Sequence, residues 1–137
     1  MADDVVLNKA ATIERCVARV REEYDGDGQE LATDQRRQDA SVLNLLRACE
    51  TAIDLTMHAV RVRALGAPQS SRDAFAMLVD AGIVERPMGE TLQRLVGFRN
   101  IAVHRYQDLD IDVLHAIVRH QLSDLEAFAA AMVRAFT

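Results

Sequence analysis

Residues 41–65, Ser-Val-Leu-Asn-Leu-Leu-Arg-Ala-Cys-Glu-Thr-Ala-Ile-Asp-Leu-Thr-Met-His-Ala-Val-Arg-Val-Arg-Ala-Leu, repeat apolar side chains at helical spacing. The stripe consists of Val42, Leu46, Cys49, Ile53, Met57, Val60 and Ala64. It predicts an amphipathic helix from about Thr33-Asp34 to about Leu65, ended by Gly66 and Pro68. A helix of roughly 30 residues is about 45 Å long, so we expect a bend or one end exposed to a partner.

Four further segments predict helices on either side of this one. They are residues 4–25, a short helix from Ser70 to Gly82, a helix that starts near Arg86-Pro87 and leads into residues 97–106, and a last helix over 111–136. The sequence Asp25-Gly26-Asp27-Gly28 predicts the turn after the first helix. Amphipathic helices with short connections predict an all-α fold, an up-and-down bundle of about five helices in a single domain over residues 1–137.

Composition excludes several classes of protein. The chain has 137 residues, of which 4% are aromatic, and this favours helix over sheet. No apolar run approaches the roughly 18 residues that cross a bilayer. The N-terminus is acidic where a secretory signal would be basic, so we predict a cytoplasmic protein. The net charge of -5 argues against a protein that coats nucleic acid, although a local basic cleft remains compatible with it.

The side chains with candidate functional chemistry stand close together in one segment, called the signature segment below. It reads Gly97-Phe98-Arg99-Asn100-Ile101-Ala102-Val103-His104-Arg105-Tyr106. Arg99 and Tyr106 would share one face of an ideal helix, whereas Arg99 and His104 would point about 140° apart. For arginine and histidine to meet one substrate, the helix must end or loosen between them, or the second residue must come from another chain.

Arginine and histidine are sufficient for RNA cleavage without a metal ion. A histidine that titrates near neutrality can accept the proton of the RNA 2′-hydroxyl. A guanidinium can hold the scissile phosphate and offset the charge of the transition state. The product would be a 2′,3′-cyclic phosphate or a 3′-phosphate. The sequence has no Asp/Glu cluster spaced for two metal ions, so we predict neither a metal site nor a cofactor. Arg94 and Arg105 are candidates to widen a basic cleft, or are surface charges.

The pattern Gly-Phe-Arg-Asn-x3-His-x-Tyr resembles the signature of HepT-type toxins in the HEPN superfamily. A middle segment with Glu50, Asp54 and His58 and a Gly-x-Pro joint strengthen the resemblance, which covers nearly the whole chain. The resemblance implies a HEPN-like bundle and a metal-independent endoribonuclease, the toxin of a type II/VII-like toxin–antitoxin pair acting on RNA such as tRNA or mRNA. It implies a homodimer with one composite cleft.

The resemblance also implies roles for individual residues. Arg99 and His104 would be catalytic, and Asn100 and Arg105 would support the turn or bind substrate. Asp54 would orient Arg99 or His104, or would be a helix pair with His58. An MNT-type nucleotidyltransferase antitoxin would transfer AMP to Tyr106, unless this tyrosine only packs.

Two functions remain open from the sequence. The alternative to the toxin is a non-catalytic helical subunit that binds substrate for, or interacts with, a nucleotidyltransferase. His115 and His120 match no motif and are interpreted as packing or surface residues.

Overall fold

The computed structural model describes residues 2–24 and 29–137. Within these residues it contains seven α-helices and one short 3-10 helix, and this confirms the predicted all-α class. The elements are α1 (Asp4–Glu23), α2 (Gln29–Thr33), α3 (Gln35–Val62), α4 (Ser71–Asp80), α5 (Arg86–His104), η1 (Tyr106–Asp108), α6 (Ile111–His120) and α7 (Leu122–Ala135). The turn predicted at Asp25–Gly28 lies outside the described residues.

Short polar side chains set the starts of four helices. Each accepts a hydrogen bond from a backbone N–H of the first turn, which would otherwise have no partner. These caps are Asp3 for α1, Asp34 for α3, Ser70 for α4 and Asp110 for α6. Helix α5 instead begins with Pro87 in its first turn, where proline costs no hydrogen bond. The starts predicted at Thr33-Asp34, Ser70 and Arg86-Pro87 are confirmed.

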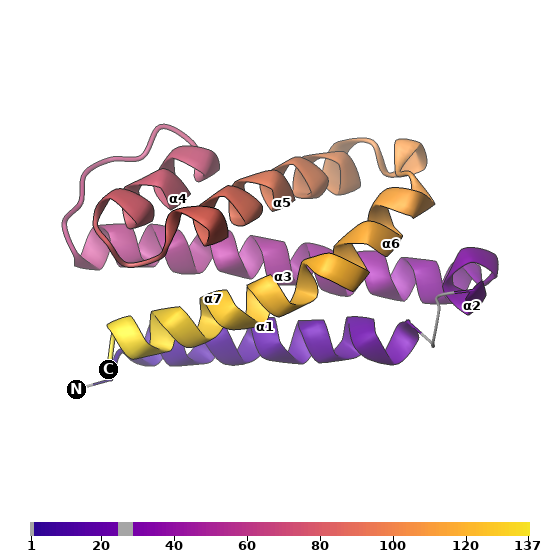
Figure 1. Cartoon of the computed structure of the whole chain (residues 1–137), viewed down its shortest axis with the longest axis horizontal. Coiled ribbons are helices and arrows are strands. Elements are labelled where there is room, and N and C mark those ends of the chain that lie inside the picture. The colour runs from indigo at the N-terminus through magenta and orange to yellow at the C-terminus, as the bar shows by residue number, and fades with distance from the viewer. Residues whose placement is uncertain (1, 25–28) are drawn as a thin grey trace.

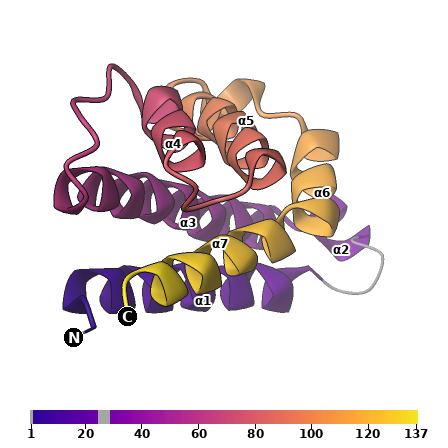
Figure 2. The ribbon, with the colours of Figure 1, turned by 60° about the vertical axis from the view of Figure 1, so that its left-hand side comes forward.

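Helix α3 lies at the centre of the bundle. It contacts α1 on one side and the hairpin of α4 and α5 on the other (Figures 1 and 2). Helix α7 lies along α1, which brings the two termini together, and the Asp3 N–H donates to the Phe136 carbonyl at 3.3 Å. Fully buried side chains from all these helices form one core, among them Ile13, Leu45, Leu55, Phe75, Leu78, Leu92, Leu125, Phe128 and Met132.

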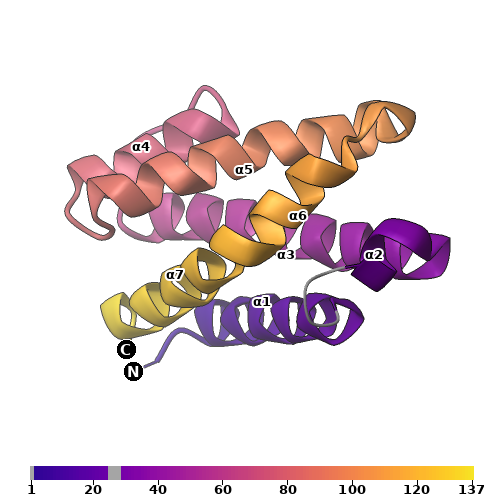
Figure 3. The same cartoon turned by 45° about the vertical axis from the view of Figure 1, so that its right-hand side comes forward.

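The last predicted helix, 111–136, is in fact two helices. It breaks at Gln121, whose backbone leaves helical values at φ -121°, ψ -9°. The break turns α6 away from the axis of α7 (Figure 2), and α6 crosses in front of α3 (Figure 3). As a result α7 packs along α1, while His115 and Arg119 of α6 reach Tyr24 at the end of α1. No glycine or proline stands at Gln121, so we attribute the break to tertiary packing.

The structure adds one short helix, α2, and extends α3 in a single run. Helix α2 was not predicted, since its five residues bury one apolar side chain, Leu31, and carry no periodic stripe. Helix α3 runs for 28 residues without a break, where the expectation was a bend or one end exposed to a partner. Its N-terminal end extends past α1 beside α2 (Figure 1).

Close packing of α4 against α5 holds the helix that carries the signature segment. A Cβ at Gly89 would lie 2.4 Å from Cγ2 of Val79, so any larger residue at this crossing would force Val79 to move. Of the helices in residues 2–24 and 29–137, none is both long and apolar enough to cross a membrane.

Candidate active site

The signature segment occupies the last turns of α5 and the start of η1. Helix α5 continues through His104, and the Arg105 N–H donates to the Ile101 carbonyl at 2.8 Å to close its last turn. The helix therefore does not end between Arg99 and His104. Within one chain the two side chains point about 140° apart, as on an ideal helix. The sequence left two ways for Arg99 and His104 to meet one substrate: the helix ends between them, or a second chain provides one of them. This backbone is compatible with the second.

Arg99 lies at the edge of the core and faces α3. Its side chain is 25% exposed, and its Nη1 lies 3.5 Å from Oε1 of Glu50. Nε of Arg99 is buried and has no hydrogen-bond partner in the described part of the chain. A guanidinium has five N–H groups, so the single long contact with Glu50 leaves donors free for a phosphate. Glu50 is partly exposed, and such a pair contributes little to stability.

Beneath this pair lies Cys49, which is buried and free. Burial raises the pKa of the Cys49 thiol to about 12, with a further rise from Glu50 and an opposing effect of Arg99. The thiol is therefore neutral at physiological pH and is not a nucleophile. Cys16 on α1 is likewise buried and free.

The polar residues at the end of α5 are open to solvent. Asn100, His104 and Arg105 are all exposed, as is the apolar Val103 between them. The structure gives none of the three polar side chains a hydrogen bond to a described residue. They are thus available to a substrate or to a second chain.

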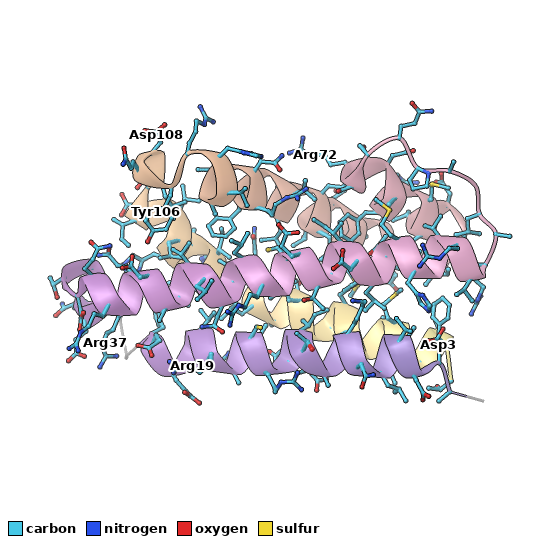
Figure 4. The ribbon with its side chains drawn as sticks, turned by 180° about the vertical axis from the view of Figure 1, so that it is seen from behind. Asp3, Arg19, Arg37, Arg72, Tyr106 and Asp108 are labelled. Carbon is cyan, nitrogen blue, oxygen red and sulfur yellow. The ribbon has the colours of Figure 1, made fainter. Side chains whose placement is uncertain are left out.

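Tyr106 is tied to α3 through its hydroxyl. The Tyr106 Oη donates a short hydrogen bond to Oδ1 of Asp39, which also accepts from Nε2 of Gln35 at 2.8 Å. Figure 4 shows Tyr106 over the N-terminal half of α3. Burial, then the hydrogen bond and charge of Asp39, raise the pKa of Tyr106 to about 12. The same hydrogen bond, followed by that of Gln35, lowers the pKa of Asp39.

An optical titration tests this contact. We expect Tyr106 to ionise near pH 12, and Asp39→Asn to move its pKa down towards the ordinary value of about 10, because the repelling charge is removed. The pKa of Tyr106 is higher in the folded chain than in the unfolded chain, so the contact favours folding while Tyr106 is neutral. This contribution to stability is fully present below about pH 10 and is lost as the pH rises through 12. The tyrosinate absorbance of each protein, minus that of the matching Tyr106→Phe chain, gives the pKa. Equal values in both proteins would contradict the assigned contact.

Two hollows flank η1 and share Leu109. One of about 320 Å³ lies between η1 and α3 and is lined by Gln35, Gln38, Val42, Tyr106, Gln107, Leu109, Ile111 and Leu114. The other, of about 360 Å³, lies between α5 and α6 and is more apolar, with Phe98, Ile101, Leu109, Val113 and Ile117 in its lining. The signature segment is thus bordered by two hollows into which part of a larger molecule can fit.

The structure corrects the expectation for Asp54. This carboxylate is 61% exposed and lies 4.0 Å from Nζ of Lys9 on α1, and it contacts neither Arg99 nor His104. Its predicted pairing with His58 is also absent, because His58 binds Asp3 at 2.7 Å. Glu50, one turn earlier on α3, has the contact with Arg99 instead. Within one chain Asp54 thus contacts neither residue that it was expected to orient, and its role towards Arg99 or His104 stays a prediction. The side chain remains open to a substrate or a second chain.

Asp39 and Glu50 are the residues near the site that sequence reasoning did not assign. Glu50 stands in the same middle segment as Asp54 and His58, so a sequence signal for it existed. No sequence signal pointed to Asp39, because it is 67 residues from Tyr106 and belongs to no motif. In the described residues no cluster of His, Cys, Asp or Glu side chains is arranged to hold a metal ion.

Comparison with known proteins decides the family. The family described as Ribonuclease HepT-like matches residues 13–132. This chain belongs to the HepT-like family. A HepT-like relative from Shewanella oneidensis, named mRNA nuclease HepT, is 44% identical over 126 residues, which is 92% of this chain and 94% of the relative.

Solved HepT-like structures share the fold closely. One is a toxin–antitoxin complex with AMP-PNP, 42% identical, with a TM-score of 0.89 over 95% of this chain and 98% of the other. Another is a tri-AMPylated Shewanella oneidensis HEPN toxin in complex with an MNT antitoxin, 43% identical, with a TM-score of 0.89 over 95% and 97% of the two chains. The predicted HEPN-like bundle and the resemblance to HepT toxins are confirmed.

Proposed function

We propose that this chain is the toxin of a toxin–antitoxin pair, an endoribonuclease that cleaves RNA without a metal ion. The observation that carries the proposal is the pairing of an exposed His104 with an Arg99 that has unused donors, on one helix of a HepT-like fold. The 44% identity to an mRNA nuclease supports RNA as the substrate. All 137 residues would act as one domain.

In the proposed reaction the substrate supplies the nucleophile. His104 accepts the proton of the RNA 2′-hydroxyl as the 2′-oxygen attacks the adjacent phosphorus. The bond from phosphorus to the 5′-oxygen breaks, and the 5′-oxygen leaves with the electron pair and takes up a proton from water. The guanidinium of Arg99 holds the phosphate and offsets the charge that builds on its oxygens. The products are a 2′,3′-cyclic phosphate and a 5′-hydroxyl. Exposed Arg105 follows His104 directly and exposed Asn100 lies about one helical turn before it, and both would contact the RNA backbone.

The proposed active form is a homodimer. Within one chain α5 keeps Arg99 and His104 on different faces, and two signature segments in one cleft would provide both groups to a single phosphate. Exposed Val103 and Val113 and the apolar hollow between α5 and α6 give this region an apolar surface suited to a second copy.

The proposed antitoxin is an MNT-type nucleotidyltransferase that transfers AMP to Tyr106. Tyr106 lies two positions after His104 and is 42% exposed, so an enzyme can reach its hydroxyl. An added AMP brings bulk and negative charge close to the two catalytic residues, which would block the cleft and offset Arg99. The tri-AMPylated relative in complex with an MNT antitoxin supports this partner.

The test is cleavage of total cellular RNA and tRNA in the presence of EDTA. We expect fragments ending in 2′,3′-cyclic or 3′-phosphates from the unmodified chain. The His104→Ala variant, purified in the same way, controls for contaminating nucleases. Intact mass is measured first, because AMP already on Tyr106 would silence the enzyme. Cleavage that requires added Mg²⁺, or no cleavage by the unmodified dimer, would argue against the proposal, and the latter result would favour a non-catalytic partner of a nucleotidyltransferase.

A further inference from the structure

The contact between Tyr106 and Asp39 joins the proposed modification site to a carboxylate with no assigned role. The two residues are on η1 and α3, and Asp39 accepts from the hydroxyl that would receive AMP. Gln35, one helical turn before Asp39, donates to the same carboxylate oxygen and holds the side chain in place. Asp39 is exposed, so the reacting atom and this carboxylate face solvent together.

Transfer of AMP to a tyrosine requires a proton acceptor. The Oη–phosphorus bond forms at the α-phosphate of ATP while the bond to pyrophosphate breaks, and pyrophosphate leaves with the electron pair. The hydroxyl proton must go elsewhere. With its pKa at about 12, Tyr106 is almost entirely neutral at physiological pH, so a base must take the proton as attack proceeds.

We propose that Asp39 is the base that accepts the Tyr106 proton during AMP transfer, so that the toxin itself supplies a catalytic group for its own modification. This inference rests on the proposed function of Tyr106. Asp39 is already in hydrogen-bond contact with Oη, as a general base must be. Its pKa is lowered by that contact, so the carboxylate is ionised and ready to accept. In protein kinases an aspartate likewise accepts the proton of the substrate hydroxyl.

The modified residue cannot re-form this contact. After transfer Oη is an ester oxygen without hydrogen, and the new phosphodiester carries a negative charge next to Asp39. Like charges at this distance repel, so the modification separates Tyr106 from α3. AMP transfer to Tyr106 thus also releases η1 from its hydrogen bond to α3.

The experiment measures the rate of AMP transfer from Mg-ATP by the MNT antitoxin of the Shewanella oneidensis complex, followed by intact mass. Asp39→Asn keeps an acceptor for the Tyr106 hydroxyl but cannot take up its proton. We expect kcat to fall about 100-fold while KM for the toxin stays within about twofold of the wild-type value. Asp39→Glu keeps a carboxylate and should recover part of the rate. Asp108→Asn, on the same turn, is the matched control and should react at the wild-type rate.

The outcomes separate this inference from the proposed function. Modification of the Asp39→Asn chain at the wild-type rate or faster overturns the inference and leaves Tyr106 as the target. A raised KM with unchanged kcat also overturns it, because Asp39 would then only position the segment. Equal modification of the Tyr106→Phe chain, or none of the wild type, overturns both. Circular dichroism and the thermal midpoint of each variant show that it is folded.

Discussion

Replacing His104 with alanine is expected to lower the rate of RNA cleavage by about 100- to 10,000-fold, the usual contribution of a general acid–base group. His104 is exposed and has no hydrogen bond to a described residue, so its loss should leave the fold and thermal midpoint unchanged. The measurement is single-turnover cleavage of a defined RNA in EDTA. Under the proposed mechanism the loss appears in kcat more than in KM, because the proton transfer occurs only in the transition state.

His120→Ala is the matched control for this prediction. His120 is also exposed and also ends a helix, α6, but it lies outside the signature segment. We expect this variant to cleave RNA at the wild-type rate. If His104→Ala cleaves as fast as His120→Ala, another residue acts as the base and the role assigned to His104 is wrong.

Replacing Arg99 with alanine is expected to lower cleavage by about 100- to 1,000-fold, comparable with removal of one preorganised group that stabilises transition-state charge. Arg99→Lys should retain part of the rate, since lysine keeps the charge and loses the paired N–H donors. The fold should tolerate both changes, as the Glu50 left without its partner is partly exposed and can be hydrated. Arg86→Ala, at the other end of α5, removes the same charge far from the site and serves as the control.

Mixing the two inactive variants tests whether the site needs two chains. If Arg99 of one chain works with His104 of its partner, a mixed dimer of Arg99→Ala and His104→Ala has one intact pair. Random reassortment makes half of the dimers mixed, so about a quarter of the wild-type activity should return. A mixture that stays inactive after subunit exchange would place Arg99 and His104 of the same chain in one site, contrary to the proposed composite cleft.

Local sequence signals predicted most of the helices for a clear physical reason. An apolar stripe and a capping side chain act within one or two turns, so Asp34, Ser70 and Pro87 mark their helix starts without reference to the rest of the chain. The break at Gln121 escaped this reasoning, since no glycine or proline stands there and the apolar stripe continues across it.

The candidate site divides in the same way. Arg99, His104 and Tyr106 were proposed because they stand within ten residues and because this segment resembles the HepT signature, both of which are visible in the sequence alone. Their partners were not. Glu50 is 49 residues from Arg99, and Asp39 is 67 residues from Tyr106. Asp54 was expected to orient Arg99 or His104, whereas Glu50, on the same segment, is the residue that contacts Arg99. The packing of α3 against α5 and α1 decides which of the two carboxylates lies there.

By itself the sequence determined the all-α class and the positions of the main helices, and it carried the residues that we propose for RNA cleavage. These follow from side-chain periodicity and chemistry along one stretch of chain. The tertiary structure alone decided that α5 stays helical through His104, that Glu50 meets Arg99 and that Asp39 holds Tyr106. Such contacts depend on how buried side chains of Phe75, Leu92 and Phe128 interlock, which sets the rotation and register of each helix against its neighbours.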